Sequence, residues 1–184
     1  MLFIFNHNQM NKGAYPNKTC AFFFYCDIID NDKKFLNSVL GLVKMMQKER
    51  ELKIGKWFSM WIDKNCKGIE ELFCFDAVYV ESWGPKYIGI KAIKHWFDEW
   101  NTRGSVKTWD IKQFFHKDEQ TIVEWYFCNE MDDGRKEEFD GLSLIQWENG
   151  KICFLKEYGC NINNYNPYQE GSEPVFRDEK SKWF

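Results

Sequence analysis

Two hairpin dipeptides constrain the fold of this chain more than any other feature: Asp133-Gly134 and Asn149-Gly150. Both tolerate the positive φ angles of tight β-turns, and both separate stretches rich in β-branched and aromatic residues. A weaker turn is predicted at residues 117–119. The strands predicted around these turns are 106–116, 121–131, 136–147 and 151–158. Because the loops are short, successive strands must run antiparallel, as a meander without parallel crossovers.

A strand, a turn and a helix are predicted ahead of the meander. The strand covers residues 77–82 and ends at the Gly84-Pro85 dipeptide, because proline cannot donate to a β-ladder. In residues 89–100 apolar side chains recur at three- and four-residue spacing, which predicts an amphipathic helix. Glu81 lies at the end of the strand, where its carboxylate faces either bulk water or the mouth of a cavity.

Helical periodicity also marks residues 43–65, and a shorter helix is predicted at residues 67–74. Trp57 and Trp61 are four residues apart, so they lie on one side of the longer helix. Two interpretations stay open for these rings: they belong to the core, or they line a pocket. The 18% aromatic content and the nine tryptophans of the chain allow the same two interpretations.

Length and charge exclude several classes of protein. A chain of 184 residues predicts one domain with appendages, large enough to fold without disulfides or metals. The 25 basic and 28 acidic residues are mixed along the chain, and the formal net charge is −3. The sequence therefore predicts no basic surface of the kind that binds nucleic acid. No apolar run approaches the roughly 20 residues of a membrane helix. We therefore expect neither a nucleic-acid partner nor a membrane partner.

The cysteines and histidines indicate neither disulfides nor a metal site. The seven cysteines form no Cys-x-x-Cys pair, and the start of the chain lacks the features of a secretory leader, so we expect reduced thiols in the cytoplasm. His7, His95 and His116 show no metal-ligand spacing. Since no phosphate loop, nucleophile elbow or metal motif is visible, the sequence predicts no cofactor and no metal.

The two ends of the chain differ from its middle. Residues 1–44 are rich in Phe and Asn and lack a clear helical period, and residues 21–29 could form a strand. An alternative is that the native start is Met45 or Met46, where the sequence becomes regular. Residues 45–160 are then the folded domain. The polar residues 161–184 are predicted to be a tail whose aromatic side chains pack on the domain or cover a pocket mouth.

Both faces of the second meander strand carry apolar side chains. Val123, Trp125 and Phe127 share one face, and the other face carries Ile122, Glu124, Tyr126 and Cys128. A sheet buried on one side only would alternate more cleanly between apolar and polar residues. Since one face must pack on the helices, the other face predicts a homodimer formed through the sheet.

Two stretches of the chain are similar to a known family. Residues 72–100 contain an F-x-x-D-A-V strand, a G-P turn and a G-x-x-A-I helix, and residues 139–158 resemble the final hairpin of the same pattern. The chain resembles the SnoaL-like domains of the nuclear transport factor 2-like superfamily over about residues 46–158. The resemblance implies an α+β fold shaped like a cone, with three N-terminal helices packed on a curved antiparallel sheet. That family includes polyketide cyclases, ketosteroid isomerases, dehydratases, epoxide hydrolases and binding modules, so the fold does not choose a reaction.

Comparison with the steroid isomerases of that superfamily implies roles for single residues. Glu81 falls at the position of their catalytic base, Ser143 at that of their oxyanion acid and Trp57 at that of their oxyanion tyrosine. Neither Trp nor Ser is an acid, which argues against steroid isomerisation itself. The residues that the resemblance turns towards the cavity are Phe97, Glu124, Tyr126, Leu155 and Glu157.

These positions support the hypothesis of an enzyme acting on an apolar small molecule. If Glu81, Glu124 and Glu157 share an aromatic cavity, burial and mutual repulsion raise their pKa values. Glu81 could then act as a general base beside a carbonyl, while Tyr126 and Ser143 donate hydrogen bonds to the oxygen. The reaction would be an isomerisation, cyclisation, dehydration or hydrolysis. The residues predicted to line the pocket are Trp57, Trp61, Tyr79, Trp83, Phe97, Trp100, His116 and Leu155.

Other interpretations stay open beside this one. The three acids could pair with Lys or Arg, or point into water, and His116 beside its turn could be exposed to solvent. The protein would then be a noncatalytic module that binds or senses an apolar small molecule, or a dimeric scaffold.

Overall fold

The computed structural model describes residues 18–177, with side chains from residue 32 onward. The chain consists of two compact units, Met1–Met45 and Met46–Phe184. Among the described residues, no helix is long and apolar enough to cross a membrane. The elements are α1 (Lys18–Ile62), α2 (Ile69–Leu72), β1 (Phe73–Val80), β2 (Lys86–Ile88), α3 (Ile90–Trp100), β3 (Gly104–Lys117), β4 (Gln120–Met131), β5 (Lys136–Glu148) and β6 (Lys151–Cys160).

The first unit is helical from Lys18 onward. Residues 21–29 lie in α1, so the prediction of a strand there was wrong. No Gly or Pro interrupts the chain from Lys18 to Leu40, and the hydrogen bonds of a helix are satisfied locally, whereas aromatic residues favour strands only where a partner strand is present. Large apolar side chains of this unit are exposed, among them Phe35, Leu36, Leu40 and Met45.

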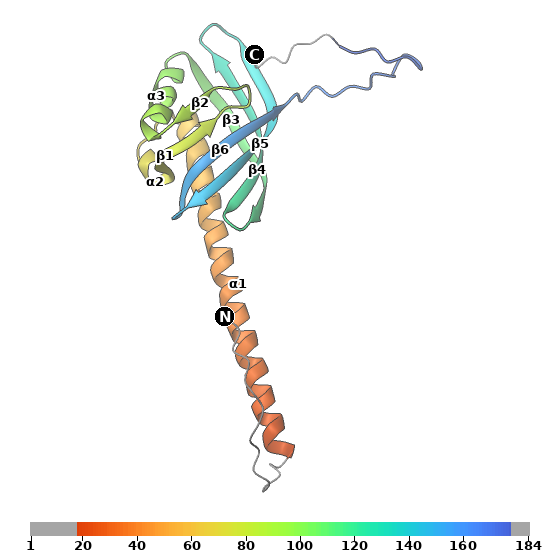
Figure 1. The fold of residues 1–184 in the computed structure, drawn as a ribbon. Coiled ribbons are helices and arrows are strands. Elements are labelled where there is room, and N and C mark those ends of the chain that lie inside the picture. Colours follow the sequence, from red (N-terminus) through yellow and green to blue (C-terminus); the bar gives the residue numbers. More distant parts are fainter. Residues whose placement is uncertain (1–17, 178–184) are drawn as a thin grey trace. The chain divides into compact units, whose positions relative to one another are not determined.

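The second unit is built on a six-stranded sheet in the order β2-β1-β6-β5-β4-β3 (Figure 1). The predicted meander from β3 to β6 is confirmed, because each successive pair of these strands is antiparallel. Its tight turns use positive φ angles of 50° at Asp118, 50° at Asn149 and 86° at Gly134. The hairpin dipeptides therefore define the strand order of this half of the sheet.

A parallel strand pair completes the sheet. β1 lies beside β6 in parallel, with Tyr79 opposite Leu155, and β2 pairs with β1 antiparallel. The prediction of antiparallel pairing covered only β3 to β6, so the parallel pair of β1 and β6 lies outside it. The turn dipeptides fix only neighbours in sequence, and they carry no information on strands that are separated by the whole meander.

The helices before and after β1 are close to their predicted positions. α2 covers only Ile69–Leu72 rather than residues 67–74, because Phe73 already begins β1. α3 starts after Gly89, whose φ of 82° is favourable only for glycine. A Cβ on Gly89 would also lie 3.3 Å from the carbonyl oxygen of Phe75. This glycine lets α3 turn back closely over β1.

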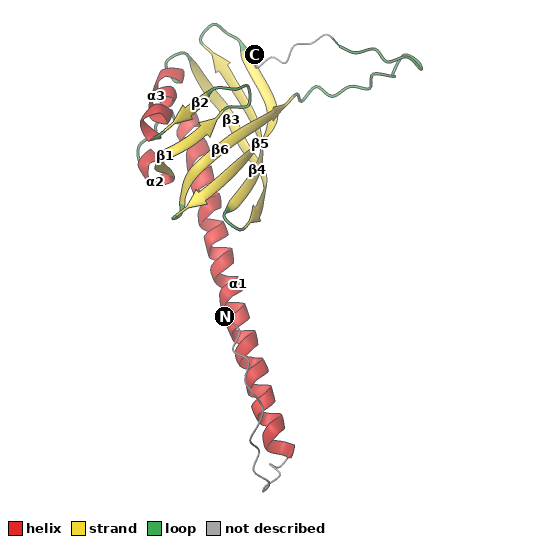
Figure 2. Ribbon diagram, viewed as in Figure 1, coloured by secondary structure: helices red, strands yellow, loops and turns green. Residues whose placement is uncertain are grey.

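The core lies between the helices and the inner face of the sheet. The C-terminal part of α1, together with α2 and α3, packs on this face, and the sheet curves around them (Figure 2). Trp57 of α1 meets Phe73 and Phe97 at ring-centroid distances of 5.0 and 5.9 Å. The predicted cone-shaped α+β fold is confirmed by this arrangement.

Candidate functional site

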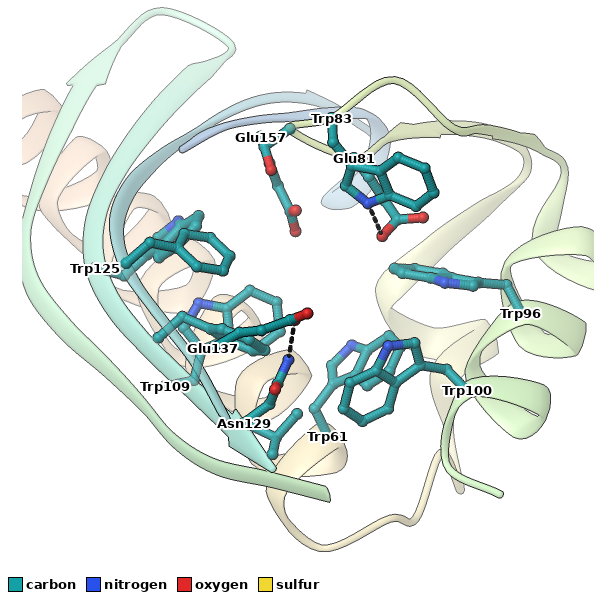
Figure 3. Close-up of a pocket in the computed structure, with 14 residues that line it drawn as sticks. Trp61, Glu81, Trp83, Trp96, Trp100, Trp109, Trp125, Asn129, Glu137 and Glu157 are labelled. Carbon is teal, nitrogen blue, oxygen red and sulfur yellow. Dashed lines mark hydrogen bonds between the residues drawn. The ribbon is translucent and has the colours of Figure 1, made fainter. Parts of the chain in front are cut away.

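A cavity opens between the inner face of the sheet and the helices, with a volume of about 90 Å³. Tryptophan rings stand on both of its sides, and carboxyl groups extend between them (Figure 3). The lining residues are Trp61, Glu81, Ser82, Trp83, Trp96, Trp100, Val106, Trp109, Trp125, Phe127, Asn129, Glu137, Phe139 and Glu157. The cavity thus combines an apolar wall with three glutamates.

One wall of the cavity consists of the inward-facing side chains of β4 and their partners on β5. Trp125, Phe127 and Asn129 point to the inner face of β4. Their direct partners on β5 are Gly141, Phe139 and Glu137. A Cβ on Gly141 would lie 2.2 Å from the Trp125 ring, so the missing side chain on β5 makes room for the indole of β4.

Glu81 follows β1 directly and is held by two donors. The Trp83 indole N–H donates to its Oε2 at 3.1 Å, and the Tyr87 hydroxyl donates to its Oε1 at 2.6 Å. Burial raises the pKa of Glu81, although Tyr87 and Trp83 oppose this shift by stabilising the charged form. Glu81 is therefore a positioned carboxylate with increased basicity.

Glu157 lies on β6 and is only 8% exposed. Burial, with a contribution from the negative charge of Glu81, raises the pKa of Glu157 to about 8. The Tyr79 hydroxyl donates to Glu157, and the Ser82 backbone N–H opposes the shift further. At neutral pH this carboxyl is consequently protonated and can act as a proton donor.

A third carboxyl group belongs to Glu137 on β5. The Asn129 side-chain N–H₂ donates to it at 2.9 Å, and Arg135 lies 3.9 Å away. The amide oxygen of Asn129 and the indole N–H groups of Trp61 and Trp109 are buried and find no hydrogen-bond partner among the described residues. A bound molecule could satisfy these groups, since unpaired buried polar atoms are costly.

An outer pocket of about 270 Å³ adjoins the cavity and shares Glu81, Trp83, Trp96, Trp100 and Glu137 with it. It adds two arginines. Each of them is paired with an acid of its own: Arg103 with Glu99 at 2.8 Å, and Arg135 with Asp133 at 2.8 Å. The site therefore has an aromatic interior and a charged entrance.

The predicted site residues divide into those inside the cavity and those outside it. Five of them line the cavity: Trp61, Glu81, Trp83, Trp100 and Glu157. Four others are buried in the core behind the lining: Trp57, Tyr79, Phe97 and Leu155. Of these four, Tyr79 contacts the site through its hydroxyl group.

The inward placement of Glu124 and Tyr126 was wrong. Both lie on the outer face of β4, where Gln113 donates to Glu124 and Tyr126 donates to Glu138 at 2.8 Å. The strict alternation of a strand requires this, because Val123 and Trp125 occupy the inner face. Neither side chain can reach a molecule in the cavity.

Ser143 and His116 also lie outside the cavity. Ser143 is fully buried behind the wall and accepts a hydrogen bond from the Trp125 indole at 2.8 Å. His116 contacts Thr121 at 3.0 Å and Glu51 at 3.3 Å, away from the lining residues. The prediction that these two side chains belong to the pocket was therefore wrong.

The sequence analysis missed Trp96, Trp109, Asn129 and Glu137 as site residues. Asn129 lies on the same face of β4 as Val123, Trp125 and Phe127. A polar amide among apolar side chains on a buried face could have indicated a site residue. Glu137 could be found only from the register that sets it opposite Asn129. Among the described residues, no group of three or more His, Cys, Asp or Glu side chains could hold a metal ion.

Comparison with known proteins gives a family match. Residues 54–155 match the SnoaL-like domain family. No curated protein matches the chain.

Solved structures share the architecture at low sequence identity. A proposed isomerase from Bacillus subtilis has 15% identity and a TM-score of 0.57, over 62% of this chain and 88% of that chain. A protein with a ketosteroid isomerase-like fold from Catenulispora acidiphila, in complex with trimethylamine, has 16% identity and a TM-score of 0.53, over 60% and 85%. An LEH-like epoxide hydrolase from Mycobacterium tuberculosis has 11% identity and a TM-score of 0.55, over 61% and 84%. At these identities the likeness shows the fold alone.

Proposed function

The chain belongs to the SnoaL-like domain family, and from this premise we propose that its cavity is an active site for proton transfer on a small molecule. Glu81 is the general base and Glu157 is the proton donor. The observation that carries the proposal is a pair of glutamates in one aromatic cavity with different surroundings. Two carboxyl groups whose environments separate their pKa values are suited to opposite roles in acid–base catalysis.

The partners of Glu81 favour the role of base. Its two hydrogen-bond donors hold the carboxylate in place, and its partial burial keeps its basicity above that of a carboxylate in water. Such a group can remove a proton from carbon beside a carbonyl, or from a water that attacks an epoxide.

The surroundings of Glu157 favour the complementary role of proton donor. Burial keeps a proton on its carboxyl group, and the Tyr79 hydroxyl holds this group in place by donating to one of its oxygens. A protonated carboxyl can donate to the oxygen on which negative charge develops. Glu157 is the direct partner of Ser143 in the β5–β6 register, so the acid expected at residue 143 is supplied by the neighbouring strand.

A noncatalytic binding module is the second candidate. The observation that favours it is that both oxygens of Glu81 already accept hydrogen bonds, from Trp83 and from Tyr87. These donors stabilise the carboxylate and so oppose its protonation. The pocket would then bind or sense a small molecule without converting it.

Turnover by three variants separates the two candidates. On a panel of carbonyl compounds and epoxides, Glu81→Gln and Glu157→Gln are each expected to lower kcat about a hundredfold or more, as loss of a general acid or base does. Glu124→Gln is the matched control, because this glutamate lies on the opposite face of the sheet. Absence of turnover by the unmodified protein on the whole panel would reject the enzyme and leave the binding module.

We also propose that the outer face of the sheet forms a homodimer. Four large apolar side chains of this face are exposed: Phe115, Ile122, Leu142 and Tyr158. Leu142 lies opposite Tyr158 in the β5–β6 register, so these exposed side chains are neighbours. Light scattering at micromolar concentration tests this proposal, and a monomer would reject it.

The functional unit is proposed to be residues 45–160, in a reducing compartment such as the cytoplasm. The division of the chain into compact units between Met45 and Met46 supports this start. The cysteines at positions 66, 74, 128, 153 and 160 are free thiols, which suits such a compartment. Mass spectrometry of the protein from its own cell tests the start of the chain, and intact Met1 peptides would reject it.

A further inference from the structure

We propose that the inner cavity binds a small organic cation, an alkylammonium group held between the tryptophan rings and the carboxyl groups of Glu81, Glu137 and Glu157. This deepens the proposed function, because it assigns a ligand class to the same site. It rests on the lining of the cavity rather than on any reaction.

The charges in the cavity have one sign. Three glutamates line it, and none of its described lining residues is Lys, Arg or His. The nearest arginines belong to the outer pocket: Arg103 is paired with Glu99, and Arg135 is paired with Asp133 and lies 3.9 Å from Glu137. An anionic ligand would be repelled by these carboxyl groups, and a cation would supply a counter-charge that the lining of the cavity lacks.

Indole rings supply the second attraction. Six of the nine tryptophans of the chain line the cavity. Trp61 meets Trp96 and Trp100 at ring-centroid distances of 4.7 and 5.5 Å on one side, and Trp109 meets Trp125 at 5.7 Å on the other. Figure 3 shows the carboxyl groups of Glu137 and Glu157 extending between these two sets of rings. The face of an indole attracts a cation, and several faces together form an aromatic cage.

The size of the cavity limits the bound group. Its volume of about 90 Å³ is smaller than the roughly 150 Å³ of a protein cavity that holds benzene. A head group of a few heavy atoms fits, and any longer part of the ligand must extend into the outer pocket. A methylated ammonium group meets this limit and keeps an apolar surface against the rings.

The carboxyl groups and the unpaired amide oxygen at the site support a cationic ligand. Burial raises the pKa values of Glu81 and Glu157, and a cation in the cavity would oppose this shift by stabilising their charged forms. Asn129 is 3% exposed and its amide oxygen has no donor among the described residues. A cation in the cavity would supply the charge, and an N–H or O–H group elsewhere on the ligand would supply the donor.

The test compares choline with its neutral isostere 3,3-dimethylbutan-1-ol, using tryptophan fluorescence and calorimetry on the full chain at one pH. We expect choline to bind with a Kd at least about tenfold lower, a difference of about 1.4 kcal/mol. Equal affinities, or no binding of choline, would overturn the proposal. The two molecules have the same shape, so only the charge is tested.

Two variants locate the binding. Glu137→Gln should weaken choline binding about tenfold while leaving the isostere unaffected, and the half-buried Trp100→Leu should weaken choline binding as well. Glu124→Gln on the outer face should change neither affinity. Unchanged choline binding in both cavity variants would place the cation elsewhere and overturn the proposal.

The same measurements keep this inference distinct from the proposed function. Choline binding without turnover of any compound in the carbonyl and epoxide panel would reject the enzyme and retain the cation site. Turnover of neutral compounds without choline binding would retain the enzyme and reject the cation site.

Discussion

The two faces of β4 have similar compositions and different roles. The inner face carries Val123, Trp125 and Phe127, all buried, whereas the outer face carries Ile122 and Tyr126, which are partly exposed. Aromatic and aliphatic side chains occur on both. The difference lies in what each face meets: the inner one borders a cavity lined by three glutamates, and the outer one is partly exposed. The composition of a strand does not identify its functional face, and the partners opposite it do.

The largest difference between the faces should appear on truncation of a ring. Trp125→Ala removes a buried indole that contacts Trp109 and Phe139, and it is expected to cost about 3–5 kcal/mol of unfolding free energy. Tyr126→Ala on the outer face should cost about 1 kcal/mol or less, because it loses one exposed hydrogen bond. Urea unfolding measures both changes. Equal losses would contradict the division of β4 into a buried face and an exposed one.

The next difference concerns how the protonation of Glu157 on the inner face makes stability depend on pH. The folded protein keeps on Glu157 a proton that the unfolded chain releases near pH 4.5, so this group stabilises the fold at low pH. Stability should then fall by roughly 1.4 kcal/mol per pH unit as the pH rises from about 5 towards 8. Glu157→Gln should remove most of this slope, apart from the contribution of Glu81, and make the variant more stable than the unmodified protein at pH 8. Glu124→Gln on the outer face should leave the slope unchanged, and unfolding curves from pH 5 to 8 measure it.

A smaller loss of stability is expected when a single methyl group is added to the wall of the cavity. Gly141→Ala places a carbon 2.2 Å from the Trp125 ring, and overpacking of this kind costs roughly 1–3 kcal/mol. Gly159 is its direct partner on β6, and a Cβ there would lie no closer than 3.4 Å to other atoms. Gly159→Ala should therefore cost clearly less. Thermal unfolding of the two variants ranks them, and the reverse order would mean that the Trp125 ring can move aside.

The smallest effect on the fold should come from the outer apolar face. Ile122 is 37% exposed, so Ile122→Glu should change the unfolding free energy of a protomer by only about 0.5 kcal/mol. The same change should prevent association through the sheet, because it places a charge in the proposed interface. Light scattering would then report a monomer for the variant and a dimer for the unmodified protein. A dimer that survives the substitution would locate the interface elsewhere.

Much of the fold could be predicted because its signals are local. Asp133-Gly134 and Asn149-Gly150 define hairpins within a few residues, and the period of α3 is visible in eleven residues. The parallel contact of β1 with β6 could not be predicted, since it joins residues that are about 75 positions apart, as Tyr79 and Leu155 are. The helix at residues 21–29 was missed because aromatic composition was read as strand propensity.

The site was predicted less completely than the fold. Glu81 was indicated by its place at the end of a predicted strand and by the family resemblance, Glu157 by the resemblance alone, and both line the cavity. The same resemblance turned Glu124 inward, although the alternation of β4 around Trp125 places it outside. Glu137 was missed because its position depends on the register between two strands rather than on its own neighbours. Side-chain direction in a sheet follows the pairing of strands, and a single sequence does not contain that pairing in full.

Protonation of Glu81 would change the two hydrogen bonds that its carboxylate accepts. If Oε2 takes up a proton, it becomes a donor and the Trp83 indole, which can only donate, releases it, whereas the Tyr87 hydroxyl can turn to accept from a protonated Oε1. The Trp83 indole is 52% exposed, so its emission is sensitive to such a release. The Trp83 indole is therefore an intrinsic fluorescent probe beside Glu81, and stopped-flow fluorescence could follow a change in this hydrogen bond against the emission of the other tryptophans.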